Sequence, residues 1–200
     1  MMKQFITILM MSVLMSVPMS GQDVSMEGVK ADIVAFSKKV SSIECDFVQV
    51  KESSLLAEKA VSSGHMNYRK PGYLEWKYLE PTPLTFTADG NNVALERDGK
   101  AGQLNGNQSR FVKKLTQLII SNIEGSILSD EKMFRSEFSM FDGNIMAVLY
   151  PQKKEIRKLW SKLVLHYDRE TMGVRKFEMH ESSGDLTVIT FSNIRYDFSE

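Results

Sequence analysis

Apolar residues near the start of the chain recur with the period of a helix. Across residues 25–43 they are spaced four, three and four apart, and charged residues lie between them. The apolar positions are Val29, Ile33, Phe36 and Val40. One apolar stripe at this spacing is typical of a helix with one buried face. The sequence therefore predicts an amphipathic helix over residues 25–43.

From residue 44 the apolar period changes from helical spacing to two. Cys45, Phe47 and Gln49 fall on one side of the pattern, and the residues between them fall on the other. This alternation predicts a strand, and more strands follow, separated by turn residues. The further predicted strands are 62–70, 73–81, 83–90 and 91–99, with turns at Pro71-Gly72, Asp89-Gly90-Asn91 and Asp98-Gly99.

A second helical pattern interrupts the strands at residues 108–125. Its apolar positions are Phe111, Leu115, Leu118, Ile119 and Ile123, and Gly125 is a suitable helix end. A looser, one-turn helical piece follows at residues 126–133. Three roles are open for the longer helix: a core helix packed on the sheet, a movable lid over an apolar cavity, or a membrane-surface helix. The last is the weakest, because its polar side has few cations and no Trp at the boundary.

The remaining residues, 133–198, alternate apolar and polar side chains around turns at 142–143, 171–173 and 182–184. Since helices do not alternate regularly with the strands, a parallel βαβ fold is excluded and a mainly β, α+β protein is favoured. Two or three helices cannot cover both faces of about ten or eleven strands. Curling the antiparallel sheet into a barrel-like shape solves this, with the helices as lid or plug over a concave apolar face.

The first residues resemble an export signal. Lys3 is followed by an apolar run to Val17 and then by small and turn-forming residues. The run is shorter than the roughly 20 residues of a membrane-spanning helix, so a cleaved signal over residues 1–21 is favoured over an N-terminal anchor. Residues 22–200 then form one domain. The lone Cys45 permits no internal disulfide and lies too far along the chain for lipid modification, so we expect a mature protein without an anchor.

The overall composition is that of one globular domain. The 200 residues are 42 % hydrophobic and 25 % charged with a net charge of zero, and Lys and Arg are dispersed. This dispersion argues against nucleic acid as the partner, because phosphate binding needs a basic patch. The seven Met residues beyond the signal suit a surface that accepts ligands of variable shape, although ordinary core packing explains them as well.

No catalytic or metal-binding motif stands out. His65, His166 and His180 lack the spacing of metal ligands, and the glycines fall in turns rather than in phosphate-binding or nucleophile motifs. Asp46, Glu75 and Asp89 are isolated in sequence. We therefore expect a protein that is not an enzyme and that uses no metal or cofactor.

An ordered set of motifs resembles one known family. The segments "CDFVQVKES", "SSGHMNYRKPGYLEWKYLEP" and "PLTFTADGNNVAL" follow the pattern of the periplasmic outer-membrane lipoprotein carriers, the LolA family, and the closing "TVITFSNIRYD" is similar too. The resemblance covers about residues 25–198. The residues in register are Phe47, Gln49, Gly64, Lys70, Pro71, Trp76, Tyr78, Pro81, Asp89 and Gly90.

The resemblance implies an incomplete antiparallel β-barrel in the periplasm, with helices as a lid over bound acyl chains. It implies acylated lipoproteins, an inner-membrane lipoprotein-releasing transporter and an outer-membrane receptor as partners of a monomer. The residues expected to wall the cavity are Leu74, Trp76, Tyr78, Leu84, Phe86, Val93 and Leu95. Those expected in the lid are Phe111, Leu115, Leu118 and Ile119.

One position departs from the family pattern. Before Pro71, where the family commonly has an Arg that latches the lid, this chain has Lys70, preceded by Arg69. Lys cannot form the planar two-pronged contact of Arg. The latch is therefore expected at Lys70, at Arg69, or in a different bond.

The alternative function is an envelope lipid- or lipoprotein-sensing module with the same fold and no transport role. The carriers' membrane receptor is a third relative, but it is lipid-anchored, and no Cys follows the signal here.

Overall fold

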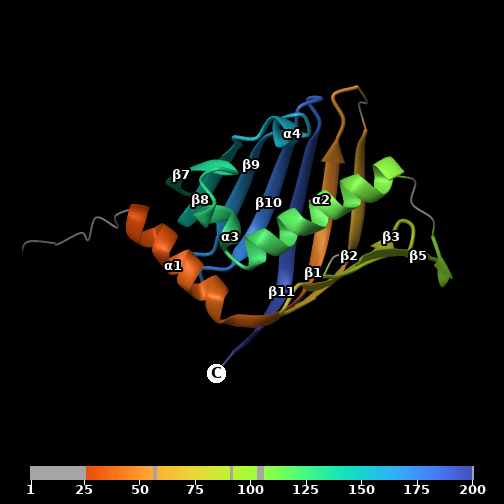
Figure 1. The fold of residues 1–200 in the computed structure, drawn as a ribbon, viewed down its shortest axis with the longest axis horizontal. Helices are drawn as coiled ribbons and strands as arrows, with labels where there is room; N and C mark the ends of the chain where they lie inside the picture. Colours follow the sequence, from red (N-terminus) through yellow and green to blue (C-terminus); the bar gives the residue numbers. More distant parts are fainter. Residues whose placement is uncertain (1–25, 56–57, 91, 103–105, 200) are drawn as a thin grey trace, which may run out of the picture.

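The computed structural model describes residues 26–55, 58–90, 92–102 and 106–199, and the predicted signal at 1–21 lies outside these ranges. Within them, one antiparallel sheet of eleven strands dominates the fold (Figure 1). The strands are β1 (Val40–Glu52), β2 (Lys59–Arg69), β3 (Tyr73–Glu80), β4 (Leu84–Asp89), β5 (Asn92–Arg97), β6 (Lys100–Ala101), β7 (Phe134–Phe141), β8 (Asn144–Pro151), β9 (Trp160–Tyr167), β10 (Val174–Glu181) and β11 (Leu186–Phe198).

The sheet consists of two meanders joined at its centre: an N-terminal meander of strands β1 to β6 and a C-terminal meander of strands β7 to β11. Its order is β6-β5-β4-β3-β2-β1-β11-β10-β9-β8-β7, so every neighbouring pair is consecutive in sequence except β1 and β11. The long strands β1 and β11 pair over most of their length, from Val40 opposite Phe198 to Glu52 opposite Leu186. The described strands β6 and β7 end the sheet without pairing with each other. The sheet is therefore open, as expected for an incomplete barrel.

In the described part of the chain, four helices accompany the sheet: α1 (Met26–Lys39), α2 (Gly106–Ile123), α3 (Ser126–Ser129) and α4 (Lys154–Arg157). The first three lie across one face of the sheet (Figure 1). The predicted helix at 25–43 was too long: it ends at Lys39, and Val40 and Ile43 are buried residues of β1. The short α4 was not predicted, because one turn carries no recognisable period.

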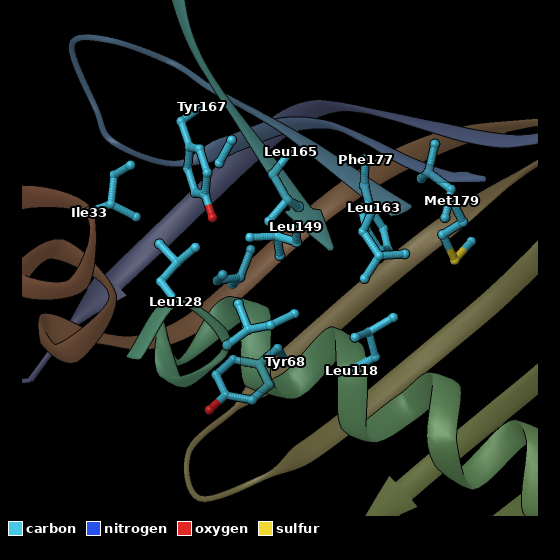
Figure 2. Packing of buried hydrophobic residues seen from close by; sticks show 14 of the residues in the cluster. Ile33, Tyr68, Leu118, Leu128, Leu149, Leu163, Leu165, Tyr167, Phe177 and Met179 are labelled. Carbon is cyan, nitrogen blue, oxygen red and sulfur yellow. The ribbon is translucent and has the colours of Figure 1, made fainter. Parts of the chain in front are cut away.

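The core fills the space between these helices and the sheet. Leu118 of α2 and Leu128 of α3 face side chains from the sheet, including Leu163 and Phe177 (Figure 2). All four are buried. Since apolar burial is the main driving force for folding, this contact explains why the helices and the sheet pack on this face.

Within the described residues, no helix is both long enough and apolar enough to cross a membrane.

Candidate ligand-binding site

The seven residues predicted for the cavity wall lie in cross-strand rows on β3, β4 and β5. In one row Trp76 pairs with Phe86, and Phe86 pairs with Leu95. In a second row Tyr78 pairs with Leu84. In a third row Leu74 pairs with Ala88, and Ala88 pairs with Val93. Directly paired residues project from the same side of a sheet. All seven therefore share one face.

Aromatic side chains cluster at the centre of this face. The Phe47 ring lies 4.3 Å from the Trp76 ring between centroids and 5.3 Å from the Tyr78 ring. The ring centroids of Phe191, on β11, and Trp76 lie 6.2 Å apart, and those of Phe86 and Tyr78 lie 6.3 Å apart. Edge and tilted contacts of this kind stabilise aromatic clusters beyond their burial alone. The cluster joins the two meanders across β1.

A first cavity lies between α1, α2 and the sheet, with a volume of about 50 Å³. Trp76 and Ile119 line it together with residues from α1 and from the C-terminal meander. Those further residues include Phe36, Met66, Tyr167, Phe177, Phe191 and Tyr196. This space is large enough for only a few water molecules.

A second cavity, of about 230 Å³, lies beneath α2 near the other end of that helix. Trp76, Tyr78 and Phe86 form part of its wall, and Leu115 and Ile119 of α2 cover it. The C-terminal meander adds Trp160, Met179 and Ile189. Both cavities are smaller than about 300 Å³, the lower end for typical ligand pockets. A ligand larger than these cavities would require α1 or α2 to move.

The other predicted wall residues lie beside these cavities rather than in their linings. Leu74 is 3 % exposed and belongs to the core. Leu84, Val93 and Leu95 are half-buried on the same face. A charged substitution at Leu74 is therefore expected to disrupt the core, which makes that position unsuitable for testing ligand binding alone.

The C-terminal meander supplies wall residues that the sequence interpretation did not name. Phe177 and Phe191 line the first cavity, and Met179 and Ile189 line the second. Their strands alternate apolar and polar residues, which identifies two faces for each strand. The pairing of β1 with β11 decides which face lies beneath α2, and this long-range contact has no local sequence signal.

The four residues predicted for the lid differ in their surroundings on α2. Leu115 and Ile119 line the second cavity, Leu118 is 7 % exposed within the core, and the side chain of Phe111 lies outside the described part of the structure. Toward the C-terminal end of the helix, the Tyr167 hydroxyl donates to Asn122 Oδ1 at 3.3 Å. Just beyond it, the Tyr68 hydroxyl donates to Glu124 Oε1 at 2.8 Å. These bonds fix the C-terminal end of α2 to strands β9 and β2.

The two residues considered for the latch, Lys70 and Arg69, contact α1 and Tyr73 of β3, respectively. Lys70 Nζ donates to the carbonyl oxygens of Lys38 at 2.7 Å and of Ser37 at 3.4 Å, both in the last turn of α1. A cation at this end of a helix stabilises its exposed carbonyls. Arg69 lies with its guanidinium carbon 4.5 Å from the centroid of the Tyr73 ring. Lys70 therefore joins the β2–β3 turn to α1.

Among the described residues, three ionisable side chains line the first cavity, Cys45, Tyr167 and Tyr196, and burial favours the neutral form of each. Burial, reinforced by the nearby Asp46 and Glu44, raises the pKa of the Cys45 thiol to about 12. Burial is also the largest cause that raises the pKa of Tyr196 to about 12, and it raises the pKa of Tyr167. The wall thus presents rings, aliphatic groups and uncharged polar atoms to a ligand.

The histidines pair with carboxylates and do not gather into a metal site. His65 lies 3.0 Å from Asp46 and 3.2 Å from Glu44, and His166 and His180 both contact Glu178. Across the described ranges, no three His, Cys, Asp or Glu residues come together as metal ligands.

Known proteins resemble the chain in sequence. Residues 38–199 match the family described as outer membrane lipoprotein carrier protein LolA. An outer-membrane lipoprotein carrier protein of Methylobacillus flagellatus is 26 % identical over 197 residues, covering 96 % of this chain and 88 % of that protein. An outer-membrane lipoprotein carrier protein of Ralstonia nicotianae is 24 % identical over 186 residues, covering 84 % of this chain and 77 % of that protein.

Among solved structures, a LolA superfamily protein of Nitrosomonas europaea aligns with 86 % of this chain and 94 % of its own length. The TM-score is 0.44 and the sequence identity is 10 %.

Proposed function

Because the chain belongs to the LolA family of outer membrane lipoprotein carrier proteins, we propose that it is a soluble periplasmic carrier. It takes up the acyl chains of lipoproteins released from the inner membrane and delivers them to the outer membrane. The observation that carries this proposal is the aromatic and aliphatic wall beneath α2, which extends over both meanders. The role requires binding and release only, with no chemical step.

The physical chemistry of the wall suits a transferable cargo. Each CH₂ removed from water contributes about 0.8 kcal/mol, so one chain of about 16 carbons gains on the order of 12 kcal/mol before ordering costs. Several chains buried completely would scarcely dissociate. A carrier therefore needs partial burial and direct transfer to a receptor with a better site.

Loading would displace α2 from the sheet. The cavities beneath it, about 50 and 230 Å³, are too small for a long acyl chain. Hydrogen bonds from Tyr68 and Tyr167 hold the residues at the C-terminal end of the helix, whereas Leu115 and Ile119 face the second cavity. We therefore assign the lid motion to the part of α2 before its C-terminal turn, with that end as the pivot.

Residues 1–21 would direct export and be removed, which leaves a monomer in the periplasm. An inner-membrane transporter would load the carrier, and an outer-membrane receptor would unload it. Lys70 would act as a latch on α1, because its amine bonds the last carbonyls of that helix.

A charge in the wall tests the proposal. Leu115→Glu places a carboxylate where acyl chains would lie, and burial of an unpaired charge is unfavourable. Gln117→Glu is the matched control, because Gln117 is exposed on the same helix and acquires the same charge. Each tagged variant is expressed in the host, and acylated lipoprotein that co-purifies from the periplasm is quantified.

We expect Leu115→Glu to lose about tenfold or more of the co-purified lipoprotein and Gln117→Glu to match the unaltered protein. Urea denaturation of both variants confirms that they are folded. Equal recovery of lipoprotein from two folded variants would contradict the assigned wall. Correct lipoprotein sorting in cells depleted of the protein would contradict carriage and favour a sensing role.

A further inference from the structure

Trp76 carries a buried hydrogen-bond donor without an acceptor. Its side chain is 5 % exposed. Within the described residues, its Nε1 is the one buried side-chain nitrogen or oxygen that has no hydrogen-bond partner. A donor left unpaired away from water is costly, and most buried polar groups in proteins are satisfied. Such a group at a candidate ligand site requires an explanation.

The neighbouring polar groups do not satisfy this donor. The Tyr78 hydroxyl donates to Gln49 Oε1 at 3.0 Å. Burial raises the pKa of Tyr78, and polar interactions of the Tyr78 hydroxyl with the Trp76 indole N–H and with Gln49 oppose that rise. The contact between Tyr78 and Trp76 nevertheless lacks the geometry of a hydrogen bond. The indole N–H therefore remains free to donate to an incoming oxygen.

Trp76 also has a distinctive position. It lines both the first and the second cavity, while Phe47 packs against its ring at 4.3 Å between centroids. A ligand that enters between α2 and the sheet would pass this side chain in either cavity.

The second cavity becomes polar along β1. Phe47, Gln49 and Lys51 are alternate residues of this strand, and the last two line the cavity. Lys51 Nζ pairs with Glu181 at 3.2 Å, and Glu181 also lines the cavity. The wall therefore changes from aromatic rings, through amide and hydroxyl groups, to an ion pair. This order suits a molecule with apolar tails, a polar linkage and a hydrophilic remainder.

We propose that the indole N–H of Trp76 donates a hydrogen bond to a carbonyl oxygen in the acyl linkage of the ligand. The tails would then lie among the aromatic side chains, and the hydrophilic part would extend toward Lys51 and Glu181. This inference rests on the proposed carrier function and adds a polar determinant to it. A purely hydrophobic site would bind a chain joined through an ether at least as tightly as one joined through an ester, because an ester carbonyl buried without a donor is unfavourable.

A pair of matched ligands tests this hydrogen bond. One is a water-soluble peptide whose N-terminal cysteine carries a dipalmitoylglyceryl thioether; the other carries two hexadecyl ether chains of the same length, without carbonyl groups. Dissociation constants are measured for the mature protein and for Trp76→Phe, which keeps an aromatic ring and removes the N–H. We expect the unaltered protein to bind the ester about tenfold more tightly and the variant to lose most of this preference.

A second measurement uses the unaltered protein and so does not depend on the variant's folding. The chain has two Trp residues, and Trp160 lines the second cavity, so its indole ¹⁵N–¹H signal reports occupancy. We expect the Trp160 signal to change with both peptides. The Trp76 indole proton should move downfield with the ester peptide alone.

The outcomes separate the two levels of the proposal. If both peptides bind with the same affinity, or if Trp76→Phe retains the full ester preference, the hydrogen bond is refuted and the carrier function stands. If neither peptide binds and neither indole signal changes, both the hydrogen bond and the acyl-binding function are refuted.

Discussion

Gly64 determines how closely the aromatic residues approach at the centre of the sheet. A Cβ atom at this position would lie 2.0 Å from the Lys77 carbonyl oxygen and 2.6 Å from Cζ of Phe47. The Phe47 ring, which would meet that atom, packs in turn on Trp76. The absence of a side chain at Gly64 thus allows β3 and Phe47 to come together and form the wall.

Gly64→Ala is expected to lower the free energy of unfolding by about 2 kcal/mol or more, because a backbone oxygen cannot move aside as a flexible side chain can. Urea denaturation measures the change. The matched control is Gly106→Ala, since a Cβ there meets nothing within 4 Å. We expect the control to remain within about 0.5 kcal/mol of the unaltered protein or to be more stable. An unchanged stability for Gly64→Ala would contradict the close approach of β3 to β2.

At the scale of elements, the C-terminal end of α2 and the turns before it differ in their contacts with the sheet. Bonds to Asn122 and Glu124 connect its C-terminal end to the sheet through Tyr167 and Tyr68. Its preceding turns cover the second cavity with Leu115 and Ile119. A helix above a cavity buries less apolar surface than one packed on a filled core. Its local stability should therefore decrease away from the C-terminal end.

Hydrogen exchange tests this difference. We expect backbone amides at 112–116 to exchange at least about tenfold faster than those at 119–123, because local opening is easier where fewer contacts are lost. Addition of an acylated peptide should change exchange at 112–116 most and leave the centre of β1 unaffected. Uniform protection along α2, equal to that of β1, would contradict a pivoting lid.

The elements themselves could largely be predicted from the sequence. Alternation and turn residues predict the strands, because each strand has one face against the core. The end of α1 could not be placed, because Val40 and Ile43 extend the apolar helical pattern although they belong to β1. For the candidate site, the rows through Trp76 and Phe86 follow from consecutive strands. The contribution of Phe177 and Phe191 depends on the β1–β11 pairing, which joins residues more than a hundred positions apart.

At the scale of the whole molecule, the open sheet and the helices across one face form a body that can accept an apolar guest between them. The pairing of β1 with β11 makes both meanders part of one wall. The described helices α1, α2 and α3 lie on that face (Figure 1). Under the proposed carrier function, a guest would enter by displacing helices, while the strand pairs would remain intact. We therefore expect loading without loss of the sheet.

Native mass spectrometry of the mature protein, purified without detergent from its own cell envelope, tests the central claim most directly. We predict a complex whose mass equals this chain plus a lipoprotein with intact acyl chains, and loss of that complex in Leu115→Glu. Detection of the bare protein alone, or of the same lipoproteins bound without their acyl chains, would contradict the proposed carrier function.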